Sequence, residues 1–279
     1  MFHALVAVKQ VPDTANIRID PETGNLIRQG VPTIINPYDA HALAAAVEWK
    51  AKLGGKITVI SMGPPSTVST IRECIEMGAD RGIIISARQF AGADTLATSY
   101  VLATIIQHIH EQDPISVVLF GKQAIDGDTA QVGPGVSIRL GFPLITYTVK
   151  IHEINLEENY MVAERKTESY NEVIRTPLPA GLTCEKEIAS IPYASLPNLV
   201  YSLKYEPEVW TAETPVMFPV DQIGLRGSPT TVFKTTQPEA HKAGEIINVT
   251  EVGVGAAVQS VFQKIKSSGV LSTVAGGAQ

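Results

Sequence analysis

The chain has 279 residues, 44% of them hydrophobic and 18% charged, which indicates a globular protein with a substantial core and excludes a disordered chain. A net charge of −6 and the lack of any long basic block exclude a protein built to bind nucleic acid. Cys74 and Cys184 stand far apart with no C-x-x-C, so neither a disulfide framework, a metal site nor an iron–sulfur site is expected, and a reducing compartment is.

The first residues lack the charged region and long apolar stretch of a signal peptide, and Ala4–Val8 is expected to be a buried strand instead. No apolar run approaches the roughly 18 residues that a membrane helix needs. The sequence therefore predicts a cytoplasmic protein with no membrane insertion.

Strand and helix patterns alternate through the first half of the chain. Short apolar runs predict buried strands at Ala4–Val8, Ile57–Ile60, Ile83–Ile85 and Val117–Phe120. Helices are expected to begin at Asn36-Pro37, at about Thr67, at Asp94 and near Val132. In the first of these helices, Leu43, Val47 and Ala51 form the expected buried stripe. Such alternation predicts an α/β fold with a doubly wound, mainly parallel, Rossmann-like sheet.

The pattern changes after about residue 143. Expected strands at Ile145–Ile154, Tyr160–Lys166, Glu172–Thr176 and Leu182–Cys184 suggest an antiparallel extension of the sheet. Residues 1–200 are therefore expected to form the nucleotide-binding domain. Residues 201–279 lack the apolar content to fold alone, with one helix expected near Val252–Ser267, and are predicted to be an arm that packs on a partner, ending in a flexible tail at 268–279.

The loop Gly121–Pro134 follows a buried strand and precedes a helix. Its glycines permit close backbone approach, and the region of Asp128 and Thr129 would offer free N–H groups to a phosphate at a helix start. The alternative is an ordinary capped turn, in which Asp128 caps the helix and Gln131 closes a capping box. Spacing alone leaves both interpretations open.

A second loop, Ala91–Ser99, opens the helix that Asp94 is expected to cap. Thr95 and Thr98 are three residues apart and share one face of its first turn, where two hydroxyls would suit a diphosphate or the edge of a flavin. Threonine near a helix start is also common for structural reasons. Asn36–Asp39 is explained by capping alone, and Ser61–Pro65 by a turn.

Familiar catalytic signatures are missing. The sequence has no P-loop, no G-x-G-x-x-G after the first strand, no G-x-S-x-G and no H-E-x-x-H. No side chain is expected to be catalytic, and no metal ligands are expected.

Taken together, the loops resemble the beta subunit of electron transfer flavoprotein. The resemblance covers most of the chain and rests on V-A-V-K-Q-V-P-D-T (Val6–Thr14), N-P-Y-D (Asn36–Asp39), S-M-G-P-P (Ser61–Pro65), G-K-Q-A-I-D-G-D-T-A-Q-V-G-P (Gly121–Pro134) and S-L-P-N-L (Ser195–Leu199). It implies a heterodimer with an alpha subunit that carries FAD, and an adenine nucleotide held by the beta subunit. The implied nucleotide contacts are Ala7, Asn36, Asp39, Met62, Gly63, Asp94, Thr95, Thr98, Gly121, Gln123, Asp126, Gly127, Asp128, Thr129, Ala130, Gln131 and Val132. The implied docking residues for partner proteins are Leu196, Pro197 and Asn198.

The family divides by the nucleotide that the beta subunit holds. Gly92–Thr98 is similar to the electron-bifurcating type, in which a second FAD takes hydride from NADH and splits the electrons between two acceptors. In the other type the ligand is AMP, with a structural role. The implied partners are a flavin dehydrogenase for acyl-CoA, lactate or a similar substrate, or a quinone oxidoreductase, with ferredoxin or flavodoxin as the low-potential acceptor. The lysine-rich continuation that mitochondrial-type members carry after the docking segment is replaced here by Tyr201–Glu206. A stand-alone ATP-binding α/β protein is disfavoured, because its phosphate loop is absent and the C-terminal arm is not self-sufficient.

Overall fold

The computed structural model describes residues 1–13, 18–19, 26–27, 32–231 and 244–269. They divide into two compact units, Met1–Thr235 and Thr236–Gln279, which are taken separately below. The tail that was predicted to be flexible lies outside the described residues from 270 onward.

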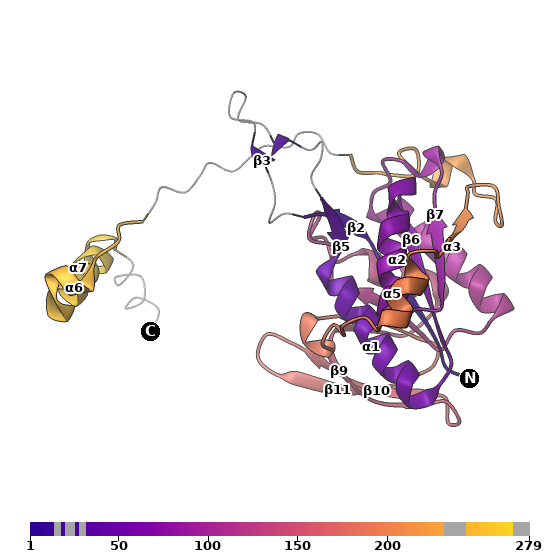
Figure 1. Ribbon diagram of the computed structural model, residues 1–279, viewed down its shortest axis with the longest axis horizontal. Coiled ribbons are helices and arrows are strands. Elements are labelled where there is room, and N and C mark those ends of the chain that lie inside the picture. Colours follow the sequence, from indigo (N-terminus) through magenta and orange to yellow (C-terminus); the bar gives the residue numbers. More distant parts are fainter. Residues whose placement is uncertain (14–17, 20–25, 28–31, 232–243, 270–279) are drawn as a thin grey trace, which may run out of the picture. The chain divides into compact units, whose positions relative to one another are not determined.

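The first unit is built on a nine-stranded sheet, with the order β11-β10-β9-β12-β8-β1-β6-β7-β13 (Figure 1). Its strands are β1 (His3–Ala7), β6 (Lys56–Met62), β7 (Arg81–Ile85), β8 (Val117–Gly121), β9 (Leu144–Asn155), β10 (Tyr160–Lys166), β11 (Asn171–Pro177), β12 (Ala180–Cys184) and β13 (Glu208–Trp210). The pairs from β9 through β12, β8, β1, β6 and β7 to β13 are all parallel, while β9, β10 and β11 form an antiparallel meander. The predicted α/β class and mainly parallel sheet are confirmed.

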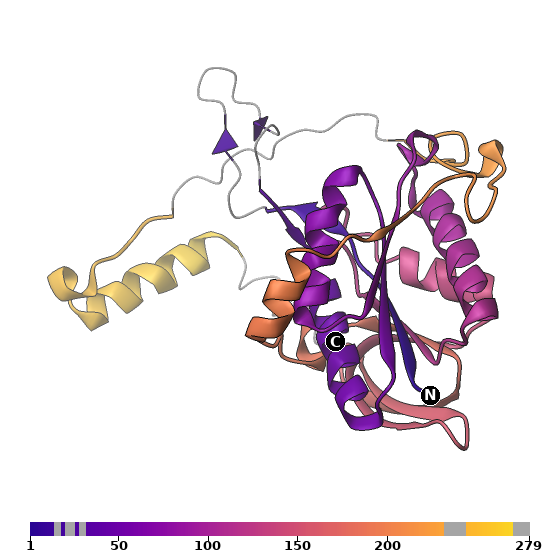
Figure 2. The same ribbon diagram turned by 45° about the vertical axis from the view of Figure 1, so that its right-hand side comes forward.

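Helices cover both faces of this sheet (Figure 2). They are α1 (Pro37–Leu53), α2 (Val68–Met77), α3 (Thr95–Gln112), α4 (Val132–Leu140) and the short α5 (Leu196–Ser202). Alternate residues of each central strand serve the two faces, as a strand's period of two requires. Ala4 and Val6 of β1 pack with α1 and α2, whereas Leu5 and Ala7 pack with α3 and α4. Single-turn helices η2 (Pro65–Thr67), η3 (Arg88–Phe90), η4 (Lys186–Ile188) and η5 (Val220–Gln222) and two small ribbons, β2 (Gln10–Pro12) with β5 (Thr33–Ile35) and β3 (Arg18–Ile19) with β4 (Leu26–Ile27), complete the unit.

Two local predictions are wrong. The segment Leu182–Cys184 belongs to β12, which is parallel to both neighbours because it inserts between β8 and β9 after the antiparallel meander. The stripe predicted for α1 includes Ala51, which is exposed. The predicted Leu43 is buried, and the rest of the buried face of α1 runs through Asp39, the alanines from Ala40 to Ala46, and Trp49. Hydrophobic periodicity does not reveal this face, because alanine is only weakly hydrophobic. Its small side chain lets the helix approach the sheet closely.

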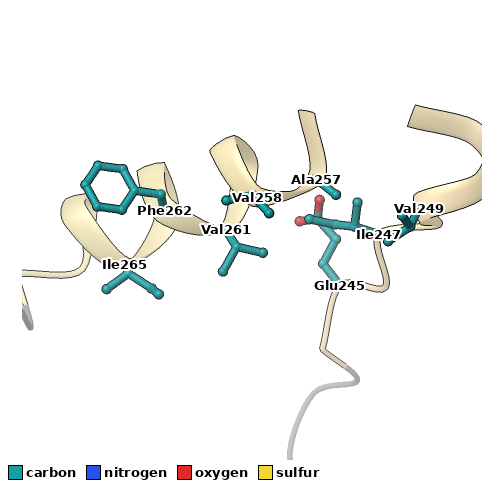
Figure 3. Close-up of a pocket in the computed structure, with 8 residues that line it drawn as sticks. All are labelled: Glu245, Ile247, Val249, Ala257, Val258, Val261, Phe262 and Ile265. Carbon is teal, nitrogen blue, oxygen red and sulfur yellow. The ribbon is translucent and has the colours of Figure 1, made fainter. Parts of the chain in front are cut away.

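In the second unit, the described residues form α6 (Val249–Val252) and α7 (Val254–Ser267). The apolar side chains Val258, Val261, Phe262 and Ile265 of α7 line a groove of about 590 Å³, as Figure 3 shows. All four are exposed, and Ala257 is the single buried residue of α7. A helix that leaves its apolar face in solvent supports packing of this C-terminal part on another chain, which remains a prediction. Glu208–Trp210, which also belongs to the arm predicted at 201–279, instead forms β13 of the main sheet.

Candidate functional site: a cavity at the strand ends

The loops that follow β1, β6, β7 and β8 enclose a cavity of about 990 Å³ at the carboxyl end of the parallel sheet. The chain winds outward from β1 in both directions, to β6 on one side and to β8 on the other, and ligands of open α/β sheets bind at such a switch point. Fifteen of the seventeen predicted nucleotide contacts line this one cavity: Ala7, Asp39, Met62, Gly63, Asp94, Thr95, Thr98, Gly121, Gln123, Gly127, Asp128, Thr129, Ala130, Gln131 and Val132. Asn36 and Asp126 do not line it.

Asp39 joins the ends of two neighbouring strands. Its Oδ2 accepts from the backbone N–H of Lys9, just after β1, at 2.8 Å, and its Oδ1 accepts from that of Gly121, at the end of β8, at 3.0 Å. Burial raises the pKa of this carboxyl to about 7, against the opposing effect of the hydrogen bonds from Asn36, Lys9 and Gly121. Asp39 therefore holds the ends of β1 and β8 together at the floor of the cavity.

Asn36 stabilises the loop after β8 and does not cap α1. It stands at the N-cap of α1, but its side chain makes no capping bond. Its Nδ2 donates to the carbonyl of Gln123 at 2.9 Å, and its Oδ1 accepts from the N–H of Ile125 at 3.2 Å. The interpretation of Asn36–Asp39 as capping alone is wrong, because both polar side chains of this segment hold other strand ends and loops in place.

The Gly121–Pro134 loop has an unusual backbone. Asp128 and Ala130 both have positive φ, 51° and 54°, although neither is glycine. Such conformations cost free energy and concentrate at functional sites. The side chain of Asp128 accepts from Gln123 Nε2 at 2.8 Å, and α4 begins after Gln131 with no side-chain cap. The capped-turn alternative is therefore wrong, and the first N–H groups of α4 are left for another acceptor.

Asp126 and Lys9 close the outer side of this loop. Lys9 Nζ lies 2.7 Å from both carboxylate oxygens of Asp126. This ion pair links the end of β1 to the loop after β8 through a residue that was predicted to contact the nucleotide directly. In the structure, Asp126 holds the loop in place through Lys9 and does not line the cavity.

The starts of α3 and α4 meet at the cavity. Asp94 caps α3 as predicted, since its Oδ1 accepts from the N–H groups of Leu96 and Ala97 at 2.9 and 3.0 Å. Thr95 Oγ1 donates to Gln131 Oε1 at 2.9 Å, which ties the two helix starts together. Thr98 lies one turn further along α3 and also lines the cavity. The uncapped start of α4 and the hydroxyl of Thr98 thus border one space as donors that suit phosphate oxygens. The first N–H groups of α3 and the hydroxyl of Thr95 are already bonded within the protein.

Most of the residues that line the cavity after β7 are outside the predicted set of nucleotide contacts. Ile85–Arg88 and Phe90–Ala93 line the cavity after β7, and further lining residues outside the predicted set are Val8, Lys9, Pro64, Pro65, Leu102, Phe120, Lys122, Ala124 and Gly133. Only its position after a strand could have identified this stretch. Ile85 ends a central parallel strand, and the residues that follow such strands lie at the edge of the sheet where ligands bind. Composition did not mark Ile85–Phe90, whereas Ala91–Ala93 belong to the loop Ala91–Ser99 that the sequence did single out.

The predicted docking residues lie elsewhere, on α5. Ser195 Oγ caps this helix by accepting from the N–H of Asn198 at 3.3 Å. Leu196 exposes 72% of its surface, and Pro197 is also exposed. None of the three docking residues lines the cavity. In the part of the chain that the structure describes, no group of three or more His, Cys, Asp or Glu side chains is placed to hold a metal ion, and no helix is long and apolar enough to cross a membrane.

Comparison with known proteins places the chain in a family. The family model described as electron transfer flavoprotein domain matches residues 23–213. Protein FixA of Azotobacter vinelandii is 42% identical over 247 residues, which are 88% of this chain and 88% of FixA. The subunit CarD of the caffeyl-CoA reductase–Etf complex of Acetobacterium woodii is 41% identical over 268 residues, 96% of this chain and 99% of CarD. The electron transfer flavoprotein subunit beta of Thermoanaerobacterium thermosaccharolyticum is 41% identical over 273 residues, 97% of this chain and 100% of that subunit. The strand-end cavity, the matched family model and these relatives together show that the chain belongs to the electron transfer flavoprotein family, as a beta-type subunit.

Proposed function

We propose that this beta-type subunit holds FAD in the strand-end cavity, where the complex with an alpha subunit oxidises NADH and divides the electrons between a high-potential and a low-potential acceptor. The observation that carries the proposal is the extent of the cavity. Its volume of about 990 Å³ stands at the upper end of the roughly 300–1,000 Å³ typical of small-molecule sites. A mononucleotide would fill only part of such a space, whereas a dinucleotide matches it.

The lining residues fit a dinucleotide chemically. Ala7, Asp39 and Gly121 form the floor at the switch point, where a mononucleotide half would lie. The uncapped start of α4 and the hydroxyl of Thr98 would hold the diphosphate through N–H and O–H donors. The wall after β7 then extends the cavity with the apolar side chains of Ile85, Phe90 and Leu102, which suit a flat ring system. AMP alone would leave this wall without a role.

Bound FAD would supply the redox chemistry, because a flavin accepts a hydride and can pass electrons on singly. The residues of this chain would bind and orient the cofactor and shape its electrostatic environment. Asp39 and Asn36 make no contact that calls for proton transfer, since their polar atoms are engaged by backbone groups. No side chain of this subunit needs to act as an acid or a base. Ferredoxin or flavodoxin would be the low-potential acceptor, in a cytoplasmic setting.

Replacing Thr98 with valine should weaken FAD binding by this subunit about tenfold, because one hydroxyl donor to the diphosphate is lost at nearly constant volume. The flavin of the alpha subunit should remain. The measurement is a flavin titration of the heterodimer that contains the variant. Thr104→Val is the matched control, since Thr104 lies on the same helix and donates to the carbonyl of Tyr100 away from the cavity. Unchanged flavin occupancy in Thr98→Val would refute this role.

The exposed apolar side chains of α5 support the proposal that Leu196 anchors a partner, a flavin dehydrogenase or a quinone oxidoreductase. Leu196 stands out from α5 beside the exposed Val200, on a segment that does not touch the cavity. Burying a leucine at a protein interface contributes on the order of 1–2 kcal/mol, so Leu196→Ala should raise the dehydrogenase concentration that gives half-maximal electron delivery about tenfold. Cofactor content should stay unchanged.

Val173→Ala is the control for this experiment. Val173 is also exposed but lies on β11, at the far edge of the sheet. An unaltered concentration dependence in Leu196→Ala, or an equal effect of both variants, would count against docking through α5.

A further inference from the structure

We propose that Arg88, in the lining of the cavity that would hold FAD, binds a phosphate group of a second dinucleotide, the NADH of the proposed reaction, and so sets the affinity for the hydride donor. The inference rests on the proposed function and adds to it a residue for substrate recognition. Three observations carry it: the ion pairing of the cationic side chains in the cavity, the rigidity of the turn that carries Arg88, and its exposure.

Three cationic side chains line the cavity, namely Lys9, Arg88 and Lys122. Lys9 is paired with Asp126 at 2.7 Å, and Lys122 with Glu185 at 2.8 Å. Arg88 has no ion pair with any carboxylate among the residues that the structure describes. The carboxylates of Asp94 and Asp128 also line the cavity, but they accept hydrogen bonds from neutral donors. The guanidinium of Arg88 is therefore left for an anionic group of a ligand. A guanidinium also offers a planar fork of donors that matches phosphate oxygens.

The backbone under Arg88 is held from both sides. Arg88 opens η3, and its carbonyl accepts from the N–H of Ala91 at 3.1 Å. The ring of Phe90 is buried edge-on against Phe218, with 5.6 Å between ring centroids. Gly224 packs so closely on this turn that a Cβ there would overlap the carbonyl oxygen of Gln89. The start of the Arg88 side chain is thus fixed, while its end remains exposed to solvent.

The exposure of Arg88 bears on whether it binds a ligand that exchanges with solution or the nucleotide that stays bound. The diphosphate of a resident dinucleotide would be served by the uncapped N-terminus of α4 and by the hydroxyl of Thr98, which supply hydrogen-bond donors. Arg88 is an exposed part of the lining, at the solvent side of the cavity. The exposed guanidinium is accessible to a ligand that exchanges with solution. The second dinucleotide of the reaction is therefore the ligand that its position favours.

The test uses the heterodimer with its alpha subunit and the variants Arg88→Gln and Arg88→Lys. Titration with NAD⁺ at equilibrium should give a dissociation constant about tenfold higher for Arg88→Gln than for the unaltered complex, with partial recovery in Arg88→Lys. The KM for NADH should rise by a similar factor, with little change in kcat. Flavin content should be unchanged. Arg226→Gln is the control, because Arg226 is exposed, carries the same charge and does not line the cavity.

Three results would overturn the inference. An NAD⁺ affinity that is the same in Arg88→Gln and in Arg226→Gln would exclude a specific contact. Loss of FAD from Arg88→Gln would mean that Arg88 serves the resident nucleotide. An unaltered complex that holds AMP in this subunit would refute the proposed function itself, and the inference would fall with it, whereas the first two results leave the proposed function intact.

Discussion

Replacing Gly121 with alanine should lower the free energy of unfolding by about 3 kcal/mol and abolish nucleotide binding by this subunit. Gly121 ends β8 directly beneath the start of α1. A Cβ at this position would overlap Asp39 Oδ1 and would lie only 2.7 Å from Tyr38 Cβ and 2.8 Å from the backbone nitrogen of Asp39. Those atoms cannot move aside cheaply, because Asp39 is fixed by its bonds to the backbone of Lys9 and Gly121. Either β8 or α1 must shift, and both border the cavity.

Gly127→Ala is the matched control, since it makes the same change in the same loop and a Cβ there would meet nothing within 4 Å. Urea unfolding of the full chains, followed by the fluorescence of Trp49 and Trp210, gives the stability difference. Nucleotide content is then measured in the heterodimers. A Gly121→Ala chain as stable as Gly127→Ala would contradict the close packing of α1 on β8.

The second large effect is expected from Asp39→Asn, and it depends on pH. Because the folded protein raises the pKa of Asp39 from 3.8 to about 7, it holds this proton more tightly than the unfolded chain does. Stability from this group is therefore fully present at low pH and is lost as the pH rises through about 7. Between pH 5 and pH 7.5 the loss amounts to about 2.5 kcal/mol in the unaltered chain. The amide that replaces the carboxyl cannot ionise, so the variant lacks this loss.

The quantity to compare is the difference in unfolding free energy between Asp39→Asn and the unaltered chain. This difference should shift in favour of the variant by about 2.5 kcal/mol when the pH is raised from 5 to 7.5. Effects of other titrating groups, including buried His3 with its lowered pKa, cancel in the difference. Thr104→Val, which changes no ionisable group, should give a difference that does not depend on pH. A constant difference for Asp39→Asn would mean that its carboxyl is ionised across this range.

The regular elements were predictable where local signals agree. The strand Tyr160–Lys166 has the predicted bounds, and α3 begins directly after its predicted cap, Asp94. Wherever long-range pairing decides the outcome, local patterns were insufficient. The parallel insertion of β12 between β8 and β9 depends on pairing with strands that the local sequence of β12 does not specify. The short edge strand β13, with three residues in a stretch rich in proline and threonine, was missed for the same reason.

Some parts of the cavity could be predicted from the sequence, and others could not. The loop from Gly121 and the start of α3 stood out because glycines and helix caps mark them locally. The roles of Asn36 and Asp126 were not visible, since a side chain that can cap a helix can equally bond to a loop 87 residues away. Arg88 carries no local signal at all. Its proposed role follows only from the three-dimensional pattern of ion pairs, in which Lys9 and Lys122 have carboxylate partners and Arg88 has none among the described residues.

Identification of the bound nucleotides tests the central claim most directly. The chain is purified together with its alpha subunit, the complex is denatured, and the released nucleotides are separated and quantified by chromatography. The account predicts two FAD per heterodimer and almost no AMP, because the cavity of this subunit extends beyond what a mononucleotide needs. One FAD with one AMP per heterodimer would contradict it and would leave this subunit as a structural scaffold with a partner-docking surface.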